Sequence, residues 1–250
     1  MAESVTFEEL EKKAQKAESL GELFGYWKEA HKVEPGTDTV SSEGGYEGID
    51  RLKSNFIPDG ISSYNGDESS KENKARVLFI LKESNTGGNV DAEQRFWFNE
   101  ALNDDDRRDY ANYLKSALER IYPDTAEERL NTVKFGYVNL NKRGGYGKTD
   151  EPAFRRYIKK YFTFIRRQIE IINPEKIIFC GCYNLAAREI FENIKNEWKE
   201  KPVPVPGSNI ILFHINHPSS GIRLLKIANT DDERTRKAIE NCNYRLDLLK

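Results

Sequence analysis

The chain has 250 residues, of which 38% are hydrophobic and 32% charged, so its apolar content suffices for one large domain with its own core. A formal net charge of −2 gives no global basicity that would mark a nucleic-acid partner, which leaves the local distribution of charge to be counted. Three scattered cysteines (Cys180, Cys182 and Cys242) are too few for a disulfide framework or a four-cysteine metal site, so we expect a reducing compartment and neither a metal nor another cofactor.

Residues 1–75 are expected to form a helical and irregular N-terminal extension. The chain opens on an acidic stretch instead of a secretory signal, and no apolar run approaches the roughly 20 residues of a membrane span. We therefore expect a cytoplasmic monomer without membrane contact. Residues 6–31, behind a capping box at Thr6, have the apolar spacing of one amphipathic helix. Residues 33–73 indicate a long irregular connection, with a short helix around residues 49–56.

Residues 76–250 alternate between strand and helix patterns. Buried strands are expected at residues 77–81, 133–140, 176–181 and 209–214, and helices at residues 92–103, 106–121, 152–172, 184–198 and 231–249. Continuous apolar strands are typical of parallel sheets that helices cover on both faces. We therefore predict a three-layer α/β/α domain with a four-stranded parallel sheet in the order 2-1-3-4 and right-handed crossovers.

Three polar loops follow predicted strands. The first contains Glu83, the second Asn139 and the third His217. Each residue also has an ordinary interpretation, as a sheet-edge cap, a turn residue or a hydrogen-bonded loop histidine. Because the carboxyl ends of parallel strands meet at one edge of the sheet, the loops are expected to converge on a ligand site.

The tripeptide His217-Pro218-Ser219 after the last predicted strand resembles the second active-site motif of the uracil-DNA glycosylase superfamily. The other loops then fall into register with that superfamily over residues 75–225. The resemblance implies a glycosylase-like α/β domain at residues 76–250. It also implies that His217 is catalytic and that Ser219 contacts the substrate.

The same resemblance implies roles for residues of the first and second polar loops. An ungapped match puts Glu83 at the carboxylate or asparagine position that orients water, although one branch places its carboxylate a residue earlier, where this chain has Lys82. Asn139 matches the asparagine that reads the flipped base. Ser84 and Asn85 stand where proline and, in the uracil-specific branch, a methyl-excluding tyrosine are usual, which implies substrate contacts and a different base preference.

The segment Ser220-Gly221-Ile222-Arg223 resembles the intercalating-loop pattern Gly-Leu-x-Arg of the superfamily with one residue inserted. The resemblance implies that Ile222 is the wedge that enters the base stack, with Leu224 as its nearest substitute. Ser220 and Arg223 are then expected to contact DNA.

Local charge supports a polyanionic partner. Residues 134–167 contain ten Lys or Arg against two acids, a local charge of +8. The ordinary explanation is a solvated helix face. The residues of this stretch that we expect to contact DNA are Lys142, Arg143, Lys148, Arg155 and Arg156.

The chemistry of these residue types is consistent with cleavage of an N-glycosidic bond. The departing base gains negative charge and the sugar gains positive charge, so a site needs a donor at the base and an anion near the sugar. His217 and Glu83 supply these groups, and Asn139 offers both a donor and an acceptor to a base edge. Phe96 is the expected stacking partner of an extruded base, unless it is a core residue.

The predicted function is that of a monofunctional DNA glycosylase, which hydrolyses the bond to a deaminated or modified base in single- or double-stranded DNA. A catalytically inactive nucleic-acid or nucleotide-binding module of the same fold is the alternative. A hydrolase of free nucleosides or nucleotides is a third hypothesis, which requires neither the wedge nor the basic stretch.

Overall fold

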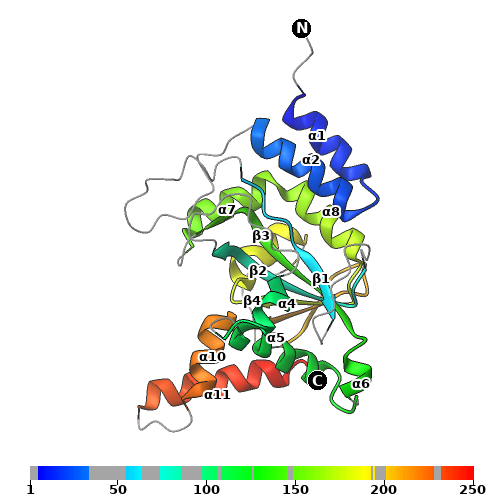
Figure 1. Cartoon of the computed structure of the whole chain (residues 1–250). Coiled ribbons are helices and arrows are strands. Elements are labelled where there is room, and N and C mark those ends of the chain that lie inside the picture. Colours follow the sequence, from blue (N-terminus) through cyan, green and yellow to red (C-terminus); the bar gives the residue numbers. More distant parts are fainter. Residues whose placement is uncertain are drawn as a thin grey trace.

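The computed structural model describes residues 5–33, 55–63, 74–85, 97–105, 108–125, 127–145, 149–192, 194, 201–227 and 232–250. They form a mixed α/β fold in which helices cover both faces of one six-stranded sheet (Figure 1). The strands are β1 (Gly60–Ser63), β2 (Val77–Asn85), β3 (Lys134–Gly145), β4 (Lys176–Cys180), β5 (Val203–Pro204) and β6 (Ile211–Ile215). The helices are α1 (Phe7–Lys16), α2 (Leu20–Val33), α4 (Trp97–Leu102), α5 (Arg108–Ile121), α6 (Glu127–Leu130), α7 (Glu151–Lys160), α8 (Phe162–Ile172), α9 (Tyr183–Ile190), α10 (Pro218–Lys226) and α11 (Glu233–Asp247).

The strand order is β1-β3-β2-β4-β6-β5. The inner strands β3, β2, β4 and β6 pair in parallel, whereas β1 and β5 add antiparallel edges. The inner four follow the predicted order, but the sheet as a whole is mixed and six-stranded instead of four-stranded and parallel. The sequence pattern missed both edges because neither is a continuous apolar run. Strand β1 reads Gly-Ile-Ser-Ser, and β5 is a Val-Pro pair in a proline-rich connector.

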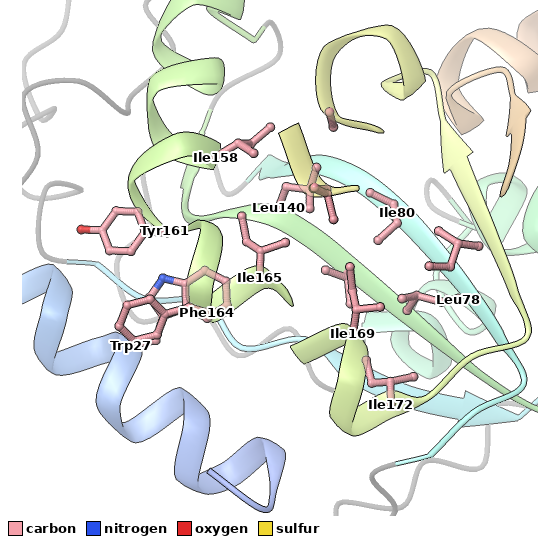
Figure 2. Close-up of a cluster of buried hydrophobic side chains, with 14 of the residues drawn as sticks. Trp27, Leu78, Ile80, Leu140, Ile158, Tyr161, Phe164, Ile165, Ile169 and Ile172 are labelled. Carbon is pink, nitrogen blue, oxygen red and sulfur yellow. The ribbon is translucent and has the colours of Figure 1, made fainter. Parts of the chain in front are cut away.

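Each face of the sheet has its own hydrophobic core. From β2, Leu78 and Ile80 join a cluster with α1, α2, α7, α8 and α9, while Val77 and Phe79 join a second cluster with α4, α5 and α11. Figure 2 shows the first cluster, in which the β2 side chains lie near Ile169 of α8. Burying each such apolar side chain contributes about 1.5–3 kcal/mol, so both faces hold β2 at the centre of the sheet.

The N-terminal segment is part of the main core. The residues expected to form one helix form two, α1 and α2, and the capping box at Thr6 is confirmed. The chain turns between them, where Ser19 Oγ accepts a hydrogen bond at the start of α2. Trp27 of α2 is fully buried, and β1 extends the sheet. The described part of residues 1–75 therefore packs into the same hydrophobic cluster as β2, α7 and α8.

Other boundaries also differ from the sequence-based expectation. Strand β2 continues to Asn85 and β3 to Gly145, past the points where loops were expected. One predicted helix is divided at Tyr161 into α7 and α8, and it ends at the left-handed Asn173 (φ 52°), in agreement with the predicted Asn-Pro stop. The segment after His217 is the helix α10 instead of a loop.

Candidate active site

The carboxyl ends of the four inner strands lie at one edge of the sheet. Parallel pairing places Leu81 beside Asn139, and Glu83 beside Asn141. Asn141 is therefore the register partner of Glu83, a neighbour that the sequence reasoning missed. Residues two positions apart share a face of a strand, so Asn141 follows from Asn139 once β3 is known to continue beyond Leu140.

The ends of β4 and β6 are in direct contact. Gly181 follows β4 with a φ of 71°, a left-handed conformation that suits glycine. A Cβ atom at Gly181 would lie 2.9 Å from His217 Cβ and 3.0 Å from the His217 backbone nitrogen. The absence of a side chain at Gly181 therefore lets the start of α10 approach the end of β4, and this places His217 at the shared edge.

The hydrogen bonds of His217 define its tautomer. His217 is the N-cap of α10, and its Nδ1 lies 3.3 Å from the Ser219 N–H and 2.8 Å from Ser219 Oγ. A backbone N–H can only donate, so Nδ1 accepts and the ring proton of the neutral imidazole is on Nε2. Burial, reinforced by the positive charge of Lys82, lowers the pKa of His217 to about 4. At neutral pH the ring is an uncharged Nε2–H donor.

Lys82 also lies at the candidate site. The sequence comparison gave it no role, because it stands at the position where one branch of the superfamily has its carboxylate. It lies in β2, on the strand face of Ile80, and its charge acts on both His217 and Cys182. Cys182 is buried and donates its thiol hydrogen bond to the carbonyl of Ile80, with Sγ and O 3.4 Å apart. Burial raises the pKa of this thiol to about 12, so Cys182 is a packing residue and not a nucleophile.

The remaining residues of the first loop are described only in part. The backbone of Glu83, Ser84 and Asn85 belongs to β2, with a break in register between Glu83 and Asn85. Their side chains lie outside the described structure. Phe96 and Lys148 lie outside the described residues altogether. The predicted roles of these five residues therefore stay predictions.

Asn139 is held by a carboxylate from the N-terminal segment. Its backbone N–H donates to Asp59 Oδ1 at 3.0 Å, and its side-chain Nδ2 donates to the same oxygen at 3.4 Å. Asp59 Oδ2 accepts from Gln168 Nε2 at 3.1 Å and forms an ion pair with Lys142. All four residues are buried. Sequence reasoning missed Asp59 because it lies in a segment read as an irregular connection.

Lys142 and Arg143 are fully buried, so their predicted role as surface contacts for DNA is wrong. Lys142 Nζ lies 5.2 Å from the centre of the Trp27 ring, and Arg143 donates to the Tyr161 hydroxyl at 2.7 Å. Burial acts to lower the pKa of Lys142, whereas the carboxylate of Asp59 favours its charged form. The reason for the error is that β3 continues beyond Leu140, beneath the N-terminal helices.

A chain of hydrogen bonds, in which each donor can be identified, gives a partner to the backbone N–H of Lys142 near the end of β3. The Lys142 N–H donates to the Tyr157 hydroxyl oxygen at 3.2 Å. His31 Nδ1 lies 2.5 Å from the carbonyl of Asn55, which can only accept, so the ring proton is on Nδ1 and His31 Nε2 accepts from the Tyr157 hydroxyl at 2.9 Å. Burial lowers the pKa of His31, consistent with this neutral ring. The chain replaces strand pairing at an edge that β1 does not reach.

The expected intercalating loop is helical. Ser219, Ser220, Ile222 and Arg223 lie in the first turns of α10, and a Cβ at Gly221 would come within 2.4 Å of the ring of Tyr113 in α5. The side chain of Ile222 packs on the second core, and Arg223 is exposed. A cleft of about 450 Å³ separates the start of α5 from α10, and it is lined by Asp109, Tyr110, Ser219, Ile222, Arg223, Lys226 and Ile227.

Acidic side chains offset part of the basic stretch. Arg155 donates to the Asn184 carbonyl at 3.1 Å and lies 3.9 Å from Glu189. Arg166 has a similar acidic neighbour in Glu192, just after α9, and Arg167 has one in Glu170 of α8. Arg156 is exposed and forms no ion pair with the described residues. Of the two arginines predicted in α7, Arg156 is therefore the one available to a phosphate.

Among the residues that the structure describes, no three His, Cys, Asp or Glu side chains gather as a metal site would require. None of the described helices combines the length and apolar character that crossing a membrane would take. No protein-family model matches the chain, and the search of curated proteins gave no match either.

Proposed function

We propose that the chain is a monofunctional DNA glycosylase, which hydrolyses the N-glycosidic bond of a deaminated or modified base flipped out of single- or double-stranded DNA. The observation that carries the proposal is the uncharged Nε2–H donor of His217, at the sheet edge toward which the neighbouring strands β2, with Glu83, and β3, with Asn139, run in parallel. Such a donor suits a leaving group that gains negative charge. The resemblance of the His217 loop to the uracil-DNA glycosylase superfamily supports the same reaction.

In the proposed reaction the bond between the sugar C1′ and the base nitrogen breaks, and its electron pair leaves with the base. His217 Nε2–H donates to a base carbonyl oxygen, and the ammonium of Lys82 adds positive potential. The carboxylate of Glu83 orients a water molecule, whose oxygen forms the new bond to C1′. The water proton passes through the carboxylate and neutralises the base, so the products are a free base and an abasic sugar.

Extruding a base from the stack costs a few kcal/mol, which contacts to phosphate and to the flipped base must offset. Of the predicted DNA contacts, Arg156 and Arg223 are exposed cations. They are the proposed phosphate contacts, whereas the buried Lys142 and Arg143 are not.

The function is tested by incubating the protein with DNA that carries uracil, hypoxanthine, xanthine or a bulky modified pyrimidine, in single and double strands. Alkali then cleaves any abasic site. Release of a free base with an intact, alkali-labile strand supports the proposal. Folded protein that binds these DNAs and yields no product from any of them supports the alternative, an inactive binding module of the same fold.

Substituting Glu83→Gln keeps the size of the side chain and removes its charge. We expect the single-turnover rate to fall about 10²- to 10⁴-fold, because the carboxylate acts on the water and the positive sugar, while DNA affinity changes little. The exposed Glu151→Gln is the matched control and retains the rate. An equal loss of rate and affinity in the Glu83 variant would instead indicate a structural role.

A further inference from the structure

Asp59 is a buried carboxylate that accepts only. Four donors surround it: the backbone N–H and the side-chain Nδ2 of Asn139 at Oδ1, and Gln168 Nε2 and Lys142 Nζ at Oδ2. A proton on Asp59 would meet one of these donors, so the hydrogen-bond pattern and the adjacent ammonium both favour the charged carboxylate.

This carboxylate determines which way the Asn139 amide faces. The two ends of an asparagine amide have nearly the same shape but opposite hydrogen-bonding roles. Turning the amide by 180° would bring Asn139 Oδ1 against Asp59 Oδ1, which places two acceptors together. In the observed orientation, Nδ2 faces Asp59, and Asn139 Oδ1 accepts no hydrogen bond from the described residues.

We infer that Asp59 is a positioning residue, which holds the Asn139 amide so that the site selects bases presenting an N–H donor beside a carbonyl oxygen. This inference rests on the proposed function. Uracil, hypoxanthine and xanthine have such an edge. Cytosine and adenine present a ring-nitrogen acceptor beside an amino group, the reverse pattern, which only a turned amide would match.

The backbone around Asp59 is held in place by hydrogen bonds between residues 55–57 and β3. The Ile57 N–H donates to the Lys142 carbonyl at 2.7 Å, and Asn55 Nδ2 donates to the Arg143 carbonyl at 2.9 Å. Residues 55–59 are therefore bonded along the β3 edge beside the ion pair, and β1 continues the pairing with β3 from Gly60. This assigns a role at the site to a segment whose sequence pattern indicates only a connection.

The variant for the test removes the carboxylate without leaving an isolated buried ammonium. Asp59→Ala combined with Lys142→Met removes both charges. Lys142→Met alone keeps the contacts of Asp59 with Asn139 and Gln168 but leaves the carboxylate without its counter-ion, so it is the control that separates loss of the ion pair from loss of the carboxylate. Rates of base release are measured on matched DNAs that carry uracil, hypoxanthine, cytosine or adenine. Urea unfolding establishes that each variant is folded.

We expect the wild type and the control to release only the bases with the N–H edge. In the double variant, release of uracil or hypoxanthine falls severalfold, mainly in kcat, and the ratio of cytosine to uracil release rises about tenfold or more, because the amide now adopts both orientations. A folded double variant with the wild-type ratio overturns the inference, and so does a wild type that releases cytosine as readily as uracil.

A second measurement does not depend on turnover or on a variant. In the NMR spectrum of the ¹⁵N-labelled wild type, the Asn139 side-chain amide is expected to exchange slowly with solvent and to shift on addition of free uracil but not of free cytosine. An inactive wild type with this selective shift would remove the glycosylase proposal and leave the positioning role standing. A rapidly exchanging amide, or equal shifts with both bases, would overturn the positioning role itself.

Discussion

At the scale of single residues, the chemistry of the site depends on which atoms carry protons. The proton of His217 is on Nε2 because Nδ1 accepts from the Ser219 N–H, and the ring is neutral because burial and Lys82 lower its pKa to about 4. A neutral imidazole donates to a developing anion without first having to be protonated. Activity that depends on His217 should therefore show no inflection at the ordinary histidine pKa of about 6.5.

Lys82→Met tests the electrostatic part of this arrangement. We expect the pKa of His217 to rise from about 4, because the nearby positive charge is gone, and to stay below 6.5, because burial is the larger cause and is retained. The ring signals of His217 in an NMR pH titration measure the shift. Lys226→Met, whose ammonium is paired with Asp109, is the control and should leave His217 unchanged. An unchanged pKa of His217 in the Lys82 variant would indicate that the two side chains lie too far apart for the charge of Lys82 to affect the imidazole.

At the scale of elements, the site is set by how closely α10 packs on α5. Gly221 is buried, and any Cβ there would overlap the ring and the hydroxyl group of Tyr113. Because His217 caps this helix, the position of α10 also determines where the imidazole lies. The fit of two helices thus determines the position of the side chain that we propose as the leaving-group donor.

Gly221→Ala should therefore destabilise the fold by about 1–3 kcal/mol, the usual cost of forcing an extra methyl group into a packed contact. Gly25→Ala is the matched control, since it also lies in a helix but has nothing within 4 Å of the added Cβ. The control should be neutral or gain up to about 1 kcal/mol from helix propensity. Urea unfolding compares the two free energies. Equal values for both variants would contradict the close packing of α10 on α5.

At the scale of the whole molecule, the N-terminal helices and the strand domain form one structure around buried charge. His31, Asp59, Lys142 and Arg143 lie within it, each with polar partners. Buried ionisable groups make stability depend on pH, since the folded and unfolded chains bind different numbers of protons. The three histidines are among these groups.

All three histidines, His31, His214 and His217, have lowered pKa values, mainly through burial. Below pH 6.5 the unfolded chain therefore binds protons that the folded chain does not, and the free energy of unfolding falls as pH drops toward about 4. A shift from 6.5 to about 4 corresponds to roughly 3 kcal/mol for each of His214 and His217. Above pH 7 their contribution is constant.

Urea unfolding between pH 8 and pH 4.5 measures this dependence. His214→Gln should make the decline below pH 6.5 shallower, because it removes one of the groups that take up protons on unfolding. Stability that stays flat from pH 7 to pH 5 would contradict neutral, buried histidines.

Local sequence patterns are enough to predict the four inner strands and most of the helices. Unbroken apolar runs such as Val77 to Leu81 predict buried strands, Thr6 predicts a cap, and Asn173-Pro174 predicts a helix stop. Alternation of strand and helix also predicts that polar strand ends lie at one edge of the sheet, which is why Asn139 and His217 are candidates from the sequence.

The surroundings of these strand ends depend on contacts between residues far apart in the chain. Long-range contacts bury Lys142 and Arg143, bring Asp59 to Asn139 across 80 positions of chain, and turn the segment after His217 into a helix. None of these long-range contacts leaves a periodic pattern in the sequence. The same residue types, such as lysine and arginine, occur both in a buried ion pair and in an exposed basic loop. Hydrogen-bond and charge compensation in the folded core distinguishes them, and it depends on partners that the local pattern does not contain.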